Sequence, residues 1–188
     1  MRIAISGTHC SGKSTLIDVF LVAHPDYRYE PEPYEALQDR GEVFAAEPDA
    51  DDFYRQLEYS IERLQVCRPG DRVIFERSPL DFVAYLLALD DLNRYTANRL
   101  LSKRSIEKVR ESIPLLDVVV FLPIDESGIV VPDEEDAELR TAVAKRLEQI
   151  LIDDDLDLFS NKRPVVIELS GATAARLRLL ESALSRVD

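Results

Sequence analysis

Eight residues near the start of the chain have the types and the spacing of a phosphate-binding loop. The segment Gly7-Thr8-His9-Cys10-Ser11-Gly12-Lys13-Ser14 matches the pattern Gly-x-x-x-x-Gly-Lys-Ser/Thr in full. The glycines let the backbone curl so that several N–H groups face one anion, and the positive end of the following helix adds to their attraction. In such a loop the lysine reaches the β- and γ-phosphates of a nucleotide, and the last hydroxyl binds Mg2+.

The loop therefore predicts ATP and Mg2+ as cofactors. Lys13 is the expected catalytic cation and Ser14 the expected metal ligand. Thr15 either extends the pair of hydroxyls or only supports the first helical turn. His9 is interpreted as a loop filler near phosphate, and Cys10 as a small variable residue or a reactive thiol. The residues expected to bind the nucleotide are Gly7, Thr8, His9, Cys10, Ser11, Gly12, Lys13, Ser14 and Thr15.

The composition is that of a globular protein with a strong negative charge. The chain has 188 residues, of which 46% are hydrophobic and 31% charged, and its formal net charge is −13. A surface this acidic repels nucleic acid and anionic membranes, so neither is an expected partner, and the phosphate site must be locally basic. No run of roughly eighteen apolar residues and no signal-peptide pattern occurs, so we expect a cytoplasmic protein.

Alternating strand and helix patterns position this loop. Apolar runs predict strands over Arg2 to Ser6, Val73 to Phe75, Asp117 to Leu122 and Val165 to Leu169, and a short aromatic segment predicts one more over Tyr27 to Glu30. Periodic segments predict helices over Lys13 to Ala23, Asp51 to Cys67, Leu80 to Leu89, Tyr95 to Ser112, Asp136 to Ile152 and Thr173 to Arg186. The alternation predicts one three-layer α/β domain over residues 1–188, with a five-stranded parallel sheet flanked by helices.

Acidic residues follow two of these strands, at the sheet edge where parallel α/β folds bind ligands. The second strand ends in Tyr-Arg-Tyr-Glu30-Pro31, and the third ends in Glu76-Arg77-Ser78. With the phosphate loop, these segments resemble the P-loop kinases of nucleosides and nucleotides. The chain looks most like the deoxynucleoside and thymidylate kinases and the nicotinamide riboside kinase domain of the bacterial bifunctional NAD regulator.

The resemblance implies a P-loop kinase-like fold and a phosphotransferase that moves the γ-phosphoryl group of ATP to a nucleoside, nucleotide or related hydroxyl acceptor. Glu30 would be the base that faces the acceptor hydroxyl, and Glu76 would hold Mg2+ or share the base role. Arg77 would orient a phosphate or hydroxyl of the substrate. The simpler alternatives are a solvated acid beside Pro31 and a structural ion pair between Glu76 and Arg77.

Many P-loop kinases close an arginine-bearing lid over the phosphates, and here the segment 124–146 has the corresponding place. Arg140 and Arg146 are the candidate lid arginines, with Arg140 counted as catalytic. The segment from Val130 to Leu139 is strongly acidic, whereas related lids carry closely clustered arginines. A surface arginine that pairs with Glu134, Asp136 or Glu138 is therefore the alternative for Arg140.

Two other functions compete with a kinase. One is an ATP-binding ATPase or regulatory protein that acts through partners, and the other is a nucleotide-binding fold without catalysis. A GTP switch should carry Asn-Lys-x-Asp, but Ser160-Asn161-Lys162-Arg163 lacks the aspartate. An AAA-type ATPase needs an apolar strand that ends in Asp-Glu, and none of the predicted strands does. An AAA-like label would thus fit the phosphate loop more than the chemistry.

The acceptor cannot be read from the sequence. Specificity is expected in the segments from Glu32 to Arg63 and from Pro79 to Arg104. Four residues there suit a base-like ring or a core equally well: Tyr34, Phe53, Tyr54 and Gln56. Asp81 either lines the acceptor site or caps a helix that begins at Pro79. The apolar helix from Leu80 to Leu89 suits a homodimer interface as well as a core.

Overall fold

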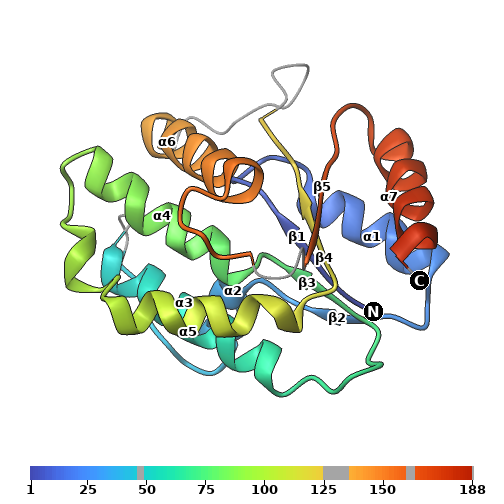
Figure 1. The fold of residues 1–188 in the computed structure, drawn as a ribbon, viewed down its shortest axis with the longest axis horizontal. Coiled ribbons are helices and arrows are strands. Elements are labelled where there is room, and N and C mark those ends of the chain that lie inside the picture. Colours follow the sequence, from blue (N-terminus) through green and yellow to red (C-terminus); the bar gives the residue numbers. More distant parts are fainter. Residues whose placement is uncertain (46–48, 125–135, 160–163, 188) are drawn as a thin grey trace.

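The computed structural model describes residues 1–45, 49–124, 136–159 and 164–187. Within them, five parallel strands form one sheet in the order β2-β3-β1-β4-β5 (Figure 1). The strands are β1 (Arg2–Ser6), β2 (Arg28–Glu30), β3 (Val73–Glu76), β4 (Val118–Phe121) and β5 (Val165–Glu168). The predicted five-stranded parallel sheet is confirmed.

The central strand β1 connects the phosphate loop to the middle of the sheet. Ile3 lies in register with Ile74 of β3 and with Val118 of β4. Every residue of β3 and β4 is buried, as expected for apolar strands that helices cover on both faces. Because the strands are parallel, Ser6, Glu30 and Glu76 end β1, β2 and β3 at the same edge of the sheet.

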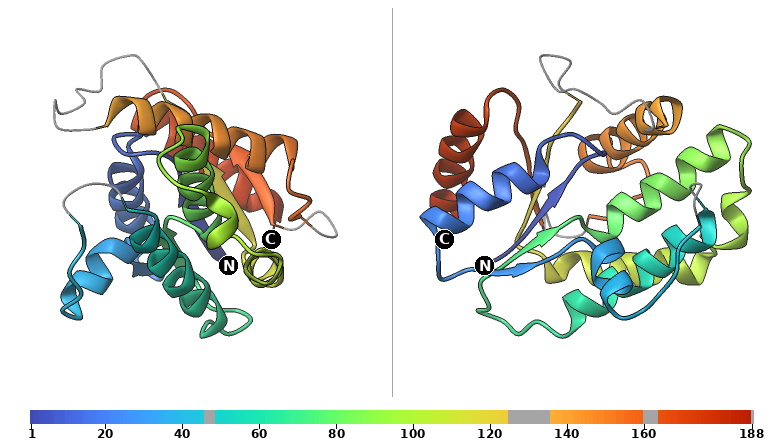
Figure 2. Two further views of the ribbon diagram at one scale, coloured as in Figure 1. Left: turned by 90° about the vertical axis from the view of Figure 1, so that its left-hand side faces the viewer. Right: turned by 180° about the vertical axis from the view of Figure 1, so that it is seen from behind.

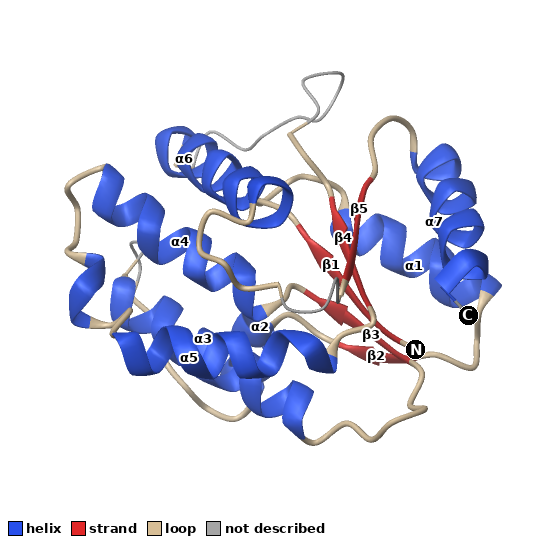
Figure 3. Ribbon diagram, viewed as in Figure 1, coloured by secondary structure: helices blue, strands red, loops and turns tan. Residues whose placement is uncertain are grey.

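Helices cover both faces of the sheet, which makes the three layers (Figure 3). On one face, α1 (Lys13–Ala23) and α7 (Thr173–Val187) bury apolar side chains against β1, β3 and β4. On the other face lie α3 (Ala50–Gln65), α4 (Pro79–Asp91), α5 (Lys103–Ser112) and α6 (Ala137–Glu148). Figure 2 shows from behind that α1 and α7 stay on one side of the sheet. The short helix α2 (Pro33–Asp39) follows β2 and has Pro33 in its first turn.

The apolar helix α4 is part of the core of this chain. It packs between α3 and α6, and Leu80, Val83, Ala84 and Leu86 are fully buried. The core interpretation of the segment from Leu80 to Leu89 is therefore confirmed. Formation of a homodimer stays a prediction, without this helix as support.

The prediction of one long helix from Tyr95 to Ser112 is wrong. A short 3-10 turn covers Ala97–Arg99, and α5 begins only at Lys103. The hydroxyl of Ser102 accepts a hydrogen bond from the backbone N–H of Ser105 at 3.2 Å, so Ser102 caps a new helix in mid-segment. The 3-10 turn Ile113–Leu115 then leads into β4. At the end of the next predicted helix, α6 continues as a π turn over Gln149–Asp153.

No helix among the described residues is both long and apolar enough to cross a membrane.

Candidate active site

The phosphate loop leaves β1 with two glycines that the geometry requires. A Cβ at Gly7 would lie 2.6 Å from the hydroxyl oxygen of Ser11 and 2.8 Å from the carbonyl oxygen of Leu122. Gly12 has a φ of 87°, in the left-handed region that glycine adopts at little cost. The chain can therefore turn from Ser6 into α1 within a few residues. This places the N-terminal end of α1, with its positive partial charge, at the loop.

Four cations from different parts of the chain donate hydrogen bonds to backbone carbonyls of the loop. The pairs are Lys13 to Thr8 at 2.9 Å, Arg77 to Gly7 at 3.0 Å, Arg140 to His9 at 3.0 Å and Arg176 to Ser11 at 2.7 Å. The locally basic site that the acidic composition demands is therefore present. Arg176 comes from α7, is only 4% exposed, and has no motif that could have marked it in the sequence.

Burial weakens the protonated form of the loop lysine. It lowers the pKa of Lys13 from 10.5 to about 8, and the positive charge of Arg77 acts in the same direction. The carboxylates of Glu32, Asp81 and Glu76 oppose this shift. A triphosphate would favour the charged form of Lys13, so nucleotide binding and proton uptake are expected to be coupled.

The two predicted metal ligands meet at the sheet edge. The hydroxyl of Ser14 donates to Oε1 of Glu76 at 2.8 Å, and the hydroxyl of Tyr29 donates to Oε2 of Glu76 at 2.7 Å. A hydroxyl beside a carboxylate is the all-oxygen set that Mg2+ prefers when nucleotide phosphates and water supply the other ligands. Ser14 and Glu76 therefore fit a bound Mg2+, with Tyr29 as a neighbour that orients the carboxylate.

Asp81 anchors the phosphate loop instead of lining the acceptor site. Its side chain is fully buried and accepts hydrogen bonds from the backbone N–H of Gly7 at 3.0 Å and from the hydroxyl of Ser6 at 2.6 Å. Together with Ser78 it also forms a capping box at the start of α4. The capping alternative is confirmed, and the same carboxylate joins the loop rigidly to α4.

The structure does not bring Glu30 to the acceptor side. Its carboxylate is bound by the guanidinium of Arg63 at 2.6 and 3.1 Å and by that of Arg28 at 2.6 Å. The carboxylate that reaches the site is Glu32, which stands two residues later and belongs to the second of two consecutive Glu-Pro pairs. This placement counts against Glu30 as the base and makes Glu32 the candidate.

Glu32 and Arg77 form the ion pair at the centre of the site. The Nε of Arg77 donates to Oε1 of Glu32, and Asp81 lies 3.7 Å from the same guanidinium. Burial acts to raise the pKa of Glu32, but the charges of Arg77 and Lys13 and the hydrogen bond from Arg77 outweigh it, so this pKa is lowered. Arg77 is 2% exposed and has a φ of 73°, a costly conformation that a bulky residue keeps only when its surroundings impose it.

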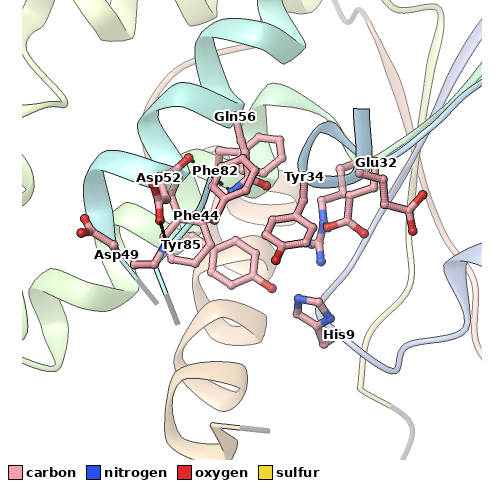
Figure 4. A pocket seen from close by; sticks show the side chains of 13 residues that line it. His9, Glu32, Tyr34, Phe44, Asp49, Asp52, Gln56, Phe82 and Tyr85 are labelled. Carbon is pink, nitrogen blue, oxygen red and sulfur yellow. Dashed lines mark hydrogen bonds and ion pairs between the residues drawn. The ribbon is translucent and has the colours of Figure 1, made fainter. Parts of the chain in front are cut away.

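A cavity of about 590 Å³ lies next to this pair (Figure 4). Its wall is formed by the phosphate loop, the start of α2, the first two turns of α3 with residues just before it, the turn after β3, and the first two turns of α4. The lining residues are His9, Glu32, Tyr34, Glu35, Phe44, Ala45, Asp49, Asp52, Phe53, Gln56, Arg77, Phe82 and Tyr85. Burial, with help from Arg77, lowers the pKa of His9 to about 4, so this side chain is neutral at pH 7.

Three of the four residues that suited a ring or a core line the cavity. They are Tyr34, Phe53 and Gln56. Tyr54 points elsewhere, with its hydroxyl 3.4 Å from that of Ser105. Two stacked aromatic pairs contribute to the wall: Tyr34 with Phe44, at 4.6 Å between ring centroids, and Phe53 with Tyr85, at 4.4 Å.

The two candidate lid arginines have different surroundings. Arg140 of α6 donates to the carbonyl of His9 and so reaches the phosphate loop. Arg146 instead forms an ion pair with Asp91 of α4, at 2.5 and 2.6 Å. Residues 125–135 of the proposed lid, with Glu134 and most of the acidic segment from Val130 to Leu139, lie outside the described residues. Asp136 and Glu138 both pair with Arg94.

Comparisons with known proteins agree on the fold. A family model described as an AAA domain matches residues 2–176. No curated protein matches the chain. Among solved structures, deoxyadenosine kinase from M. mycoides with bound dATP is similar with a TM-score of 0.66 and 17% identity, over 98% of this chain and 100% of that one. Thymidylate kinase from Candida albicans has a TM-score of 0.67 and 15% identity, over 98% and 91% of the two chains.

The NadR protein in complex with NAD and AMP-PNP is similar with a TM-score of 0.66 and 14% identity, over 99% of this chain and 49% of that one. This chain therefore spans about half the length of NadR. At such identities these likenesses show the fold alone, whereas the family model covers almost the whole chain. The chain belongs to the AAA-domain family, and its fold is that of the P-loop nucleoside and nucleotide kinases.

Proposed function

We propose that this protein is a phosphotransferase that moves the γ-phosphoryl group of ATP to a hydroxyl group of a small molecule bound in the cavity. One observation carries this proposal: the cavity and the phosphate loop share a wall. Arg77 lines the cavity and also donates to the carbonyl of Gly7 at 3.0 Å, and His9 belongs to both the loop and the cavity. A molecule in the cavity would therefore lie beside the phosphates of a nucleotide on the loop.

The proposed reaction is a direct transfer. The acceptor hydroxyl donates a hydrogen bond to Glu32, whose lowered pKa keeps it ionised at neutral pH. The oxygen attacks the γ-phosphorus, the bond to the bridging oxygen breaks, and ADP leaves while the hydroxyl proton passes to Glu32. Arg77 orients Glu32 through its Nε, and the carboxylate lines the cavity.

Charge neutralisation is the other part of the mechanism. Lys13 and Arg140 both reach the phosphate loop and would stabilise the negative charge that spreads over the moving phosphoryl group. Ser14 and Glu76 would hold Mg2+, which neutralises charge on the β- and γ-phosphates when it is bound. Glu76 is committed to Ser14 and Tyr29, which favours the metal role for it over the base role.

A coupled assay of ADP release tests this function. The purified protein is supplied with ATP, Mg2+ and a panel of nucleosides, nucleotides and other small hydroxyl compounds. At least one acceptor should stimulate ADP release, and Lys13→Ala should abolish the stimulation. ADP release at the same rate with and without every acceptor would reject the kinase proposal and favour an ATPase that acts through partners.

A further inference from the structure

Carboxylates dominate the charges that line the cavity. Glu32, Glu35, Asp49 and Asp52 all face it, against a single guanidinium from Arg77. Figure 4 shows Asp49 and Asp52 at one end and Glu32 at the other, with aromatic rings between them. Since His9 is neutral at pH 7, it adds no positive charge. Among the side chains that line the cavity, carboxylates therefore outnumber cations by four to one.

The one cation in the lining is already bound. The guanidinium of Arg77 donates to Glu32 and to the carbonyl of Gly7, and it lies over the ring of Tyr85 at 5.2 Å from the centroid. Its side chain is 1% exposed, so little of it is open to a ligand. The guanidinium positions Glu32, and because Nε and Nη1 are already bonded, neither pair of adjacent nitrogens is fully free to grip a phosphate group as a fork.

Only part of the negative charge is compensated. Asp52 pairs with Arg55 and accepts the backbone N–H of Ala45 at 2.8 Å. Glu35 and Asp49 have no cationic partner among the described residues. Burial, followed by the charges of Glu32 and Glu76, raises the pKa of Glu35, which reflects the same crowding of like charges.

The rest of the wall suits a flat ring with polar edges. Between the carboxylates lie the stacked pairs of Tyr34 with Phe44 and Phe53 with Tyr85. Gln56 is only 4% exposed, and its Nε2 donates to the carbonyl of Asp52 at 3.3 Å. Among the described residues no other hydrogen bond joins this amide, which therefore has donor and acceptor capacity left for a ligand.

From these charges we infer that the acceptor carries no phosphate group: it is a neutral or cationic compound with a flat polar ring and a free hydroxyl. This inference rests on the proposed function, because it names the acceptor class of the same site. A phosphate dianion in the cavity would face Glu35 and Asp49, which have no cationic partner among the described residues; both are exposed, so solvent screens the repulsion, but it still disfavours the dianion. A neutral nucleoside-like ring meets no such opposition.

The experiment compares matched pairs of acceptors that differ only in a phosphate. Binding of several nucleosides and of their 5′-monophosphates is measured by calorimetry on the full chain, in the presence of ADP and Mg2+. Phosphoryl transfer to both sets is measured in parallel. We expect at least one nucleoside to bind about tenfold or more tightly than its monophosphate and to be the better acceptor.

A charge-reduced variant, Glu35→Gln with Asp49→Asn, tests the cause of the discrimination. Asparagine still caps α3, where Asp49 now accepts the N–H of Asp51 at 2.7 Å, so the fold should tolerate the change. The preference for the nucleoside should shrink by about threefold or more. The control, Asp18→Asn with Glu111→Gln, removes the same charge at exposed positions outside the cavity and should leave the preference unchanged.

The outcomes separate the inference from the proposed function. Tighter binding and faster turnover of a monophosphate would overturn the inference while the kinase function stands. Binding of a nucleoside without any phosphoryl transfer would uphold the acceptor class and reject the kinase function. If neither set binds or reacts, both fail. An equal change of preference in the charge-reduced and control variants would reject the electrostatic cause.

Discussion

Replacing Glu32 by glutamine removes the proposed base while keeping the size of the side chain. A positioned general base contributes about 10²–10⁴ to a rate. We therefore expect kcat to fall by about 10² or more, which corresponds to roughly 2.7 kcal/mol of transition-state stabilisation. The variant also leaves the buried guanidinium of Arg77 with a neutral partner, although Asp81 at 3.7 Å still compensates part of its charge. A loss of about 1–3 kcal/mol in the free energy of unfolding should accompany the kinetic effect.

The matched variant Glu30→Gln separates catalysis from stability. Glu30 accepts three charge-assisted hydrogen bonds, from Arg63 and Arg28, whose side chains are 24% and 50% exposed. Solvent screens these pairs, so we expect a loss of about 1–2 kcal/mol in the free energy of unfolding. In a chain of this size that loss lowers Tm by roughly 2–8 °C. With saturating acceptor and below this Tm, kcat should change by less than about threefold.

The assay is steady-state phosphoryl transfer combined with thermal unfolding of the same preparations. The reasoning requires that Glu32→Gln be catalytically impaired while still folded, and that Glu30→Gln be destabilised while still active. A Glu30→Gln variant that loses about 10² in kcat while Glu32→Gln keeps wild-type turnover would refute it. A variant pair with equal kinetic losses would show instead that neither carboxylate acts alone as the base.

Three further predictions concern the phosphate site. The pKa of Lys13 falls from 10.5 in the unfolded chain to about 8 in the fold, so the unfolded chain binds more protons between these two pH values. The stability of the nucleotide-free protein should therefore rise with pH in that range. ATP affinity measured by calorimetry should fall above about pH 8, and Lys13→Arg should remove this dependence. Tyr29→Phe removes the hydroxyl that donates to Glu76. Mn2+ binding to the complex with a non-hydrolysable ATP analogue should weaken by about tenfold, as measured by electron paramagnetic resonance titration. An unchanged Mn2+ affinity would show that the hydroxyl does not orient Glu76. Arg176→Met removes a buried donor to the carbonyl of Ser11 and should lower the free energy of unfolding, measured with denaturant, by about 1.5–3 kcal/mol. Arg176→Lys should lower it by an intermediate amount. Equal losses in the two variants would mean that packing and not charge is responsible.

The sequence predicts the sheet well because β1, β3, β4 and β5 are mostly apolar runs beside turn residues, whereas the polar strand β2, Arg28–Glu30, is indicated by its aromatic residue and by the proline after it. The helix α1 from Lys13 to Ala23 matches its prediction at both ends, since the loop glycine begins it and His24-Pro25 ends it. The helix α5 is less predictable. The periodic pattern from Tyr95 to Ser112 runs across Ser102 without a break. The capping role of Ser102 depends on the local turn and cannot be recognised from the residue type alone.

Only part of the candidate site can be predicted from sequence motifs. The phosphate loop could be placed because its function lies in local backbone geometry, which the glycine spacing encodes. Tyr29 and Arg176 could not be found in this way, since they approach the loop and Glu76 only through the packing of β2 and α7. Their partners are 47 and 165 residues away along the chain, and nothing in the local sequence distinguishes them from other exposed tyrosines or helix-surface arginines.

The choice between Glu30 and Glu32 depends on a distinction that sequence pattern alone does not resolve. Both residues precede a proline, so both match a glutamate at the end of a strand. The difference arises because Glu30 is still part of β2, where its side chain meets Arg63 of α3, whereas Glu32 has already left the strand as the N-cap of α2. At that point the chain turns over the sheet edge, and Glu32 meets Arg77. The positive φ of Arg77 brings its guanidinium toward the same place. Two turns that follow different strands therefore bring this pair together, and both turns must form before the proposed base is in place.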